Sequence, residues 1–176
     1  MALGFISVKR KGLHYDLAKF AVSKLKKMNL LVKGKTERHY EHTVVSYFQA
    51  SPKLRKNLIT QIDEKKEVEK ITQASLFGFK HRPDTTIGKD GTAIEIKVIK
   101  GSQSVREILG QSIAYRMHYR FVILVLIDHT PNRQIVKLCH KKDSHEFKLL
   151  SGLAKDLNIF SIIGPKAQYK NIAFFS

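Results

Sequence analysis

One uninterrupted apolar run, residues 121–127, limits the folds open to this chain of 176 residues. Arg120 and Asp128 flank the run, which has the length of a strand and is far too short to span a membrane. A strand without polar alternation has to be covered on both faces, as at the centre of a sheet that carries helices on each side. The run therefore predicts a layered α/β fold.

The rest of the chain alternates between helical and extended patterns. Apolar residues recur at three- and four-residue steps in four stretches, which predicts helices over 15–31, 36–49, 103–118 and 143–156. Apolar runs bounded by turn residues predict strands over 74–79, 84–87, 92–99, 159–163 and 171–175. Residues 53–73 are charged with sparse apolar positions, and we interpret them as solvent-facing helices or an ordered excursion. This order predicts a mixed sheet between helices.

The charge balance favours a polyanionic partner. Lys and Arg number 32 against 15 Asp and Glu, which gives a net charge of +17. Such an excess costs self-repulsion and is usually kept where a polyanion neutralises it, most often a nucleic acid. The alternative is a basic protein that contacts ribosomes, RNA or an anionic membrane.

The sequence also indicates the compartment. Cys139 is the single cysteine, so no internal disulfide can form and nothing favours an oxidising environment. The apolar start of the chain is too short for a signal peptide, and its basic residues follow the apolar segment. We expect an intracellular, soluble protein, cytoplasmic or nucleoid-associated, without a membrane partner.

Three charged residues near the hairpin at 84–99 could meet at one phosphate. Asp84 begins the first strand, and Glu95 and Lys97 lie two apart on the second, so that these two share a face. The opposite face then carries the apolar residues Ile94, Ile96 and Val98. Two carboxylates beside an ammonium group suit metal-assisted cleavage of a nucleic-acid backbone.

The spacing of the acid and the lysine is weak evidence by itself. Three other acids lie two before a lysine, at 63/65, 64/66 and 146/148, and we interpret them as solvated surface. The setting of Glu95 and Lys97 distinguishes them, because they follow a hairpin turn in a β-rich stretch with Pro83 and Asp84 on the preceding strand. The alternative is a half-exposed hairpin with a charged outer face and an ordinary turn at Asp84.

On these residues the chain resembles the PD-(D/E)xK nuclease superfamily over roughly residues 36–128, extending to 163. The resemblance implies a restriction-endonuclease-like fold, a mixed β-sheet flanked by helices, over 36–176, with residues 1–35 as an N-terminal helical extension. It implies that Asp84 and Glu95 bind Mg²⁺, for which Mn²⁺ can substitute, with the main-chain carbonyl of Ile96 as a further ligand. Lys97 takes the place of the catalytic lysine.

The family also uses a glutamate on its first core helix. Glu41 is our choice, because apolar residues follow it at three, four and seven positions, similar to archaeal Holliday-junction resolvases. Glu37 lies one helical turn earlier on nearly the same face and is the second candidate. Either acid could instead be a solvent-facing residue near a helix start, where the helix dipole favours it.

A glutamine and a tyrosine in the next helix add a second resemblance. Gln111 and Tyr115 lie four apart on one helix face, similar to the Gln-x-x-x-Tyr element of RecB-like nucleases. Gln111 would help to orient Lys97, and Tyr115 would hold a phosphate oxygen. Both could equally be helix-surface residues. Candidates for backbone contacts with the nucleic acid are Arg82, Lys100, Arg106 and Arg116.

Other chemistries lack their motifs in this sequence. It contains no G-x-x-x-x-G-K phosphate loop and no G-x-S-x-G. Cys139, His140 and His145 lack a second close pair of zinc ligands.

The sequence therefore predicts a Mg²⁺-dependent nuclease that acts on DNA, as a homodimeric endonuclease of resolvase or restriction type. A RecB-like exonuclease and a non-catalytic basic DNA-binding protein remain as alternatives.

Overall fold

A six-stranded mixed sheet forms the centre of the computed structural model, which describes residues 5–6, 8–30, 35–60, 73–76, 78–165 and 170–175. The strands follow the order β1-β4-β5-β6-β7-β8, in which β5, β6 and β7 are parallel and the outer pairings are antiparallel. Their bounds are β1 (Leu58–Thr60), β4 (Thr85–Ile87), β5 (Thr92–Ile99), β6 (Phe121–Asp128), β7 (Ile159–Gly164) and β8 (Ile172–Phe174).

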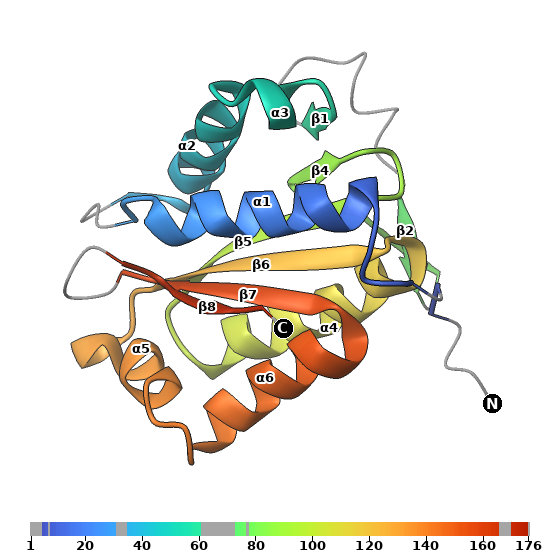
Figure 1. Ribbon diagram of the computed structural model, residues 1–176. Helices are drawn as coiled ribbons and strands as arrows, with labels where there is room; N and C mark the ends of the chain where they lie inside the picture. The colour runs from blue at the N-terminus through green and yellow to red at the C-terminus, as the bar shows by residue number, and fades with distance from the viewer. Residues whose placement is uncertain are drawn as a thin grey trace.

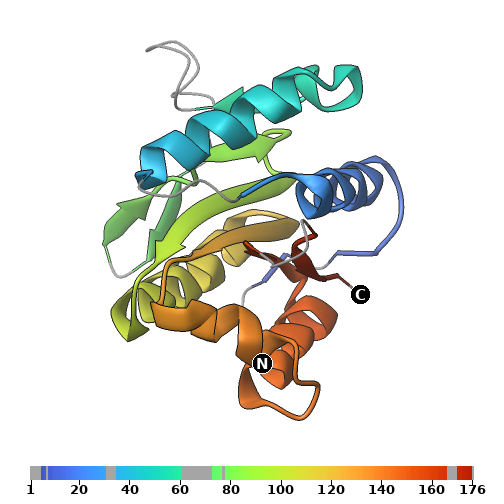
Figure 2. The same ribbon diagram turned by 90° about the vertical axis from the view of Figure 1, so that its left-hand side faces the viewer.

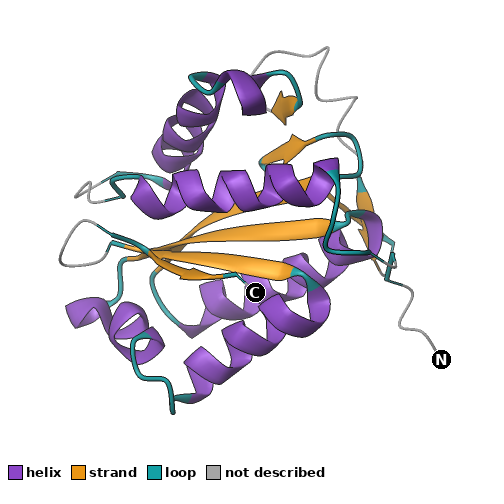
Figure 3. Ribbon diagram, viewed as in Figure 1, coloured by secondary structure: helices purple, strands orange, loops and turns teal. Residues whose placement is uncertain are grey.

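Helices cover both faces of this sheet (Figures 1 and 3). One face carries α1 (Leu13–Lys27), α2 (Glu37–Gln49) and the short α3 (Pro52–Arg55). The other carries α4 (Ser102–His118), α5 (Gln134–Cys139), which follows the 3₁₀ turn Pro131–Arg133, and α6 (His145–Leu157). The view in Figure 2 separates the same two layers. A separate hairpin of β2 (Ala74–Leu76) and β3 (Phe79–His81) lies beside α4.

The prediction of a layered α/β fold is confirmed. Every residue of β6 is buried, as expected for a central strand covered on both faces. The expected strands at 84–87, 92–99, 159–163 and 171–175 and the helices at 36–49, 103–118 and 143–156 are present, with small changes at their ends. In the part of the chain that the structure describes, no helix is long and apolar enough to cross a membrane.

The first helix, which lies in the expected N-terminal extension of residues 1–35, packs into the hydrophobic core. α1 buries Leu17, Ala21 and Leu25, and these belong to the same hydrophobic cluster as the central strands β6 and β7. Tyr15 packs on Phe121 of β6, with 5.8 Å between the ring centroids. A helix that was only appended to the domain would not pack against the central strands of the sheet. The folded unit therefore includes α1.

Other predicted elements changed in part. The strand expected at 74–79 is divided into β2 and the start of β3, with Gly78 at the turn in a left-handed conformation, φ 81°. Of the segment at 53–73, the structure places α3 and β1, and residues 61–72 lie outside the described residues. The short helix α5 was not expected. It follows two left-handed residues, Asn132 and Arg133, and its Val136 amide donates to the buried carboxylate of Asp128 at 2.9 Å.

Arg116 has a structural position, which corrects its expected role in nucleic-acid binding. Its side chain is buried at 4% exposure and donates to the carbonyls of Leu157, Tyr119 and Ile6 at 2.6, 2.9 and 2.8 Å. These bonds tie the end of α4 to the end of α6 and to the N-terminal segment. A guanidinium held this way cannot reach a phosphate.

We expect Arg116→Met to lower the free energy of unfolding by about 3 kcal/mol or more, because it leaves three carbonyls without their charged donor. Arg106→Met is the matched control, since Arg106 lies on the same helix and is exposed, and the change there should stay within about 0.5 kcal/mol. Urea unfolding of both variants measures the difference. Equal stability of the two would contradict the structural role of Arg116.

Candidate active site

Strand β5 extends beyond its neighbour β4, and this leaves an open edge in the sheet. β4 pairs with β5 only as far as Thr85 opposite Ile94, while β5 continues to Ile99 against β6. On the open edge, alternate amides of β5 meet side chains in place of a strand. The Ile96 amide donates to Asp84 Oδ2 at 2.7 Å, and the Val98 amide donates to Glu37 Oε2 at 2.9 Å.

Asp84 and Glu95 lie next to each other at the start of this edge. Extending the β4–β5 register by one residue from the pair Thr85 and Ile94 places Asp84 opposite Glu95, and opposite residues share a face. The pKa of Asp84 is raised to about 7, mainly by burial and also by the charges of Glu41 and Glu37, in spite of the hydrogen bond from the Ile96 amide. Burial also raises the pKa of Glu95, and the charge of Asp84 adds to the shift.

The side chain of Glu95 is buried between its own strand, β5, and the helix α4. The residue is 6% exposed, and its Oε2 is buried without a hydrogen-bond partner. The Tyr115 hydroxyl donates to the carbonyl of Arg82 at 3.0 Å and lies next to this carboxyl group. Burial and the neighbouring Glu95 both raise the pKa of Tyr115, so its hydroxyl keeps its proton.

Of the two glutamates on the first core helix, Glu37 makes the closer contacts with β5. Besides accepting from the Val98 amide, it forms an ion pair with Lys97 through Oε1 at 3.3 Å. Glu41 lies one turn further along α2, close enough for its charge to raise the pKa of Asp84. The pKa of Glu41 is itself raised, by burial and then by Glu37. Both candidates therefore belong to one acidic cluster with Asp84 and Glu95.

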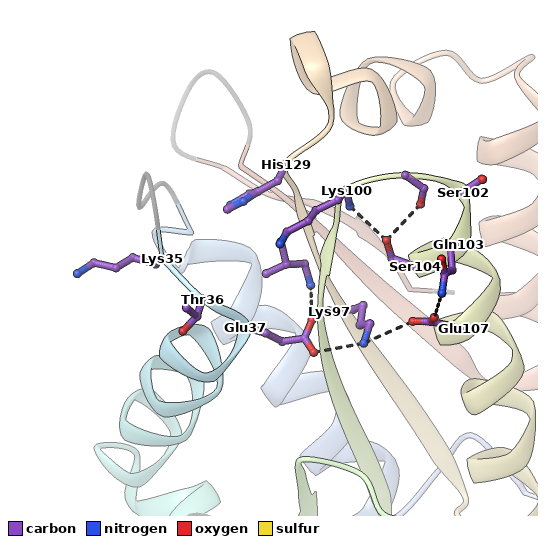
Figure 4. A pocket seen from close by; sticks show the side chains of 12 residues that line it. Lys35, Thr36, Glu37, Lys97, Lys100, Ser102, Gln103, Ser104, Glu107 and His129 are labelled. Atoms are coloured by element: carbon purple, nitrogen blue, oxygen red, sulfur yellow. Dashed lines mark hydrogen bonds and ion pairs between the residues drawn. The ribbon is translucent and has the colours of Figure 1, made fainter.

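Lys97 lies between acids from the two helix layers. Its ammonium group is 3.3 Å from Glu37 on α2 and 3.8 Å from Glu107 on α4 (Figure 4). Burial acts to lower the pKa of Lys97, but Glu37 and Glu107 outweigh it, and the pKa lies above its ordinary value. Lys97 is therefore a fixed positive charge at neutral pH.

The oxygen atoms at the open edge suit a hard cation such as Mg²⁺. A buried carboxylate without a partner is costly, so the unpartnered oxygen of Glu95 calls for a proton or a cation. The Ile96 carbonyl points to the same edge as its amide, which already contacts Asp84, because both groups of a strand residue face one neighbour. Within the described residues, no three His, Cys, Asp or Glu side chains form a ready metal-binding group.

The remaining predicted residues are divided between this cluster and the surface. Gln111 lies on α4 with its Oε1 buried and without a partner, beside a pocket of about 370 Å³ between α4 and the β2–β3 hairpin. Arg106 lines the same pocket and is exposed, as are Arg82 and Lys100. Tyr115 is 1% exposed, so the predicted direct contact with a phosphate is wrong, and it supports Glu95 instead.

Sequence reasoning missed Glu107, although a signal for it was present. Four polar residues of α4 are spaced four apart, which places them along one helix face: Gln103, Glu107, Gln111 and Tyr115. Gln103 donates to Glu107 at 2.9 Å, and Glu107 faces Lys97. Extending the Gln111 and Tyr115 pair by one turn towards the start of the helix would have found it.

The comparisons with known proteins give no relative. No family model, no curated protein and no solved structure matches this chain.

We expect the metal-free protein to lose stability as the pH rises from 5 to 8. The pKa of Asp84 is about 7 in the folded state against 3.8 as its ordinary value, so its neutral form favours folding at low pH and its charged form opposes folding above pH 7. Asp84→Asn removes this titration and keeps an acceptor for the Ile96 amide. Thermal unfolding in EDTA should show that wild type loses at least about 3 °C more than the variant between these pH values.

The comparison with Asp84→Asn cancels the effect of the other titrating groups, among them the 8 histidines. Parallel pH profiles of the two proteins would show that Asp84 is not buried beside other acids.

Proposed function

We propose that this protein is a Mg²⁺-dependent nuclease that hydrolyses phosphodiester bonds in DNA, with a restriction-endonuclease-like fold. The observation that carries the proposal is the pair of Asp84, which is half-buried, and Glu95, which is buried with one carboxylate oxygen unpartnered. Glu95 lies two strand residues from the charged amine of Lys97. A pair of desolvated acids is costly to keep in a fold, and clefts with such perturbed groups are usually functional.

Asp84, Glu95 and the carbonyl of Ile96 would hold the metal ion, with Glu41 or Glu37 as a further acidic ligand, directly or through water. When bound, the ion offsets the charge of the attacked phosphate and makes a bound water a stronger nucleophile at neutral pH. Asp84 and Glu95 must lose their protons for this role, and their raised pKa values mean that these protons leave as the cation binds.

Lys97 would stabilise the negative charge that develops on the phosphate oxygens in the transition state. Its raised pKa favours this electrostatic role, with orientation of the attacking water, over the abstraction of a proton. The acids Glu37 and Glu107 keep the amine in place before substrate arrives. The net charge of +17 supports a polyanionic substrate.

The first candidate activity is that of an endonuclease. One active site at the acid cluster would cut one strand, and a homodimer would bring two such sites to the two strands of a duplex. The resemblance to resolvases on the first core helix supports this activity.

The second candidate activity is that of a RecB-like exonuclease, and a specific observation favours it. Tyr115 contacts Glu95, and Gln111 places a buried, unpartnered oxygen on the same face of α4. Tyr115 therefore lies beside the acid cluster, and Gln111 lies one helical turn before it on α4. The rival from another class is a non-catalytic DNA-binding protein, whose binding would depend on salt and would not require Mg²⁺.

The first test is cleavage of plasmid and linear DNA with Mg²⁺ by Glu95→Gln and Lys97→Met. Each variant should lose at least about 100-fold in rate, because each removes a group that acts on the transition state. Asp90→Asn is the control, since Asp90 is an acid of the β4–β5 turn that pairs with Arg120 at 3.5 Å, away from the cluster. Full activity of Glu95→Gln in the presence of Mg²⁺ would refute the proposal. Full activity of the wild type in EDTA would refute the requirement for a metal ion.

A second test distinguishes the two activities. An endonuclease should cut circular single-stranded DNA or covalently closed duplex DNA, whereas an exonuclease degrades a linear strand and spares a circle without ends. Gel analysis of matched circular and linear substrates of one sequence gives the answer. Degradation of the linear DNA alone would rule out the endonuclease and favour the role of Gln111 and Tyr115.

A further inference from the structure

A large pocket adjoins the acid cluster at the carboxyl ends of β5 and β6. Its volume is about 970 Å³, and it lies between the start of α2 and the start of α4 (Figure 4). In α/β sheets, ligands bind preferentially outside the carboxyl ends of the strands. The volume is at the upper end of the range for ligand pockets and accommodates a nucleotide unit.

Two residues of the acid site also line the pocket. Lys97 and Glu37 line the pocket and also lie at the open edge of β5. Glu95 precedes Lys97 by two residues on the same face of the strand, which is roughly 6.6 Å at the rise of a β-strand. A DNA strand whose phosphate is held at Asp84 and Glu95 through a metal ion would therefore extend into this pocket in one direction.

Among the described residues, the two lysines on the far side of the pocket lack acidic partners. Lys100 follows β5 and His129 follows β6, and their side chains reach towards the same side (Figure 4). Lys35, which is exposed, lines the pocket from the segment before α2. Among the described residues, neither Lys35 nor Lys100 has an acid within ion-pair distance, whereas Lys97 has two.

His129 adds a fixed polar group to this side of the pocket. Its Nε2 is 3.2 Å from the Tyr40 hydroxyl, and this contact holds the ring at the pocket wall. Burial, Arg133 and Lys100 lower the pKa of His129, so the ring is neutral in the free protein. The Lys100 amide is held by the hydroxyl of Ser104 at 3.3 Å, which fixes the backbone from which the lysine projects.

We propose that this pocket binds the phosphate next to the scissile bond on the cleaved DNA strand, with Lys100, His129 and Lys35 as its ligands. The proposal rests on the proposed nuclease function and assigns one direction of the substrate strand, from the acid cluster towards the ends of β5 and β6.

The first experiment measures DNA binding in EDTA as a function of salt, so that it does not depend on cleavage. A single phosphate contact contributes about 0.9 to the slope of log K against log salt on duplex DNA. Lys100→Ala should reduce the slope by about that amount, and Lys155→Ala, an exposed lysine on α6, should leave it unchanged. An unchanged slope for Lys100→Ala, or an equal loss for Lys155→Ala, would overturn the assignment of the pocket.

The second experiment identifies the phosphate. On a duplex whose cut position has been mapped, a neutral methylphosphonate replaces the phosphate on one side of the cut or on the other. Wild type should lose roughly tenfold in kcat/KM on one side only, because a charged hydrogen-bond partner is removed. On unmodified DNA, Lys100→Ala should lower kcat/KM by a similar factor. On the methylphosphonate strand it should lower kcat/KM little further, because the phosphate that Lys100 contacts is already neutral.

The outcomes distinguish this inference from the function on which it rests. In one outcome, wild type cleaves with Mg²⁺, but the loss in kcat/KM from Lys100→Ala and the loss from the methylphosphonate multiply when both changes are combined. In that case Lys100 acts on a different phosphate, so the inference fails and the proposed nuclease function remains. If wild type cleaves no DNA with Mg²⁺, the proposed function fails, and the place of the pocket beside a scissile bond fails with it.

Discussion

The edge of β5 that β4 leaves uncovered is the constraint on which the rest of the site depends. Backbone amides inside a fold have to be hydrogen-bonded. A strand that extends beyond its neighbour leaves alternate amides without a partner strand. Here Asp84 and Glu37 accept from Ile96 and Val98 in place of a strand. The pairing requirement of the sheet thus brings two acids, one from the residue before β4 and one from α2, to the same edge as Glu95 and Lys97.

The cluster is poorly arranged for stability alone. Burial and mutual repulsion raise the pKa values of Asp84, Glu95 and Glu41, and the buried oxygen of Glu95 has no partner. Lys97 offsets the charges of all three acids in part, but Glu37 and Glu107 already pair with it. A cation would remove most of this cost, which is why the arrangement favours metal-dependent chemistry over a structural ion-pair network.

Much of the fold follows from patterns that one strand or helix contains by itself. The apolar run of β6 and the hairpin turn before β5 predicted the central layers and placed Glu95 and Lys97 on one face. The sequence could not tell Glu37 from Glu41, because the choice depends on where α2 crosses the end of β5. It also missed the burial of Arg116 and Tyr115, since their partners Ile6, Leu157 and Arg82 are distant in the chain or belong to loops.

The central claim is that the open edge of β5 binds a divalent cation, and calorimetric titration with Mg²⁺ at pH 8 tests it without DNA. Wild type should show saturable binding with release of protons, and Asp84→Asn and Glu95→Gln should each lose it, whereas Asp90→Asn should bind as wild type does. Absence of Mg²⁺ binding in wild type, or equal binding in all four proteins, would contradict the account.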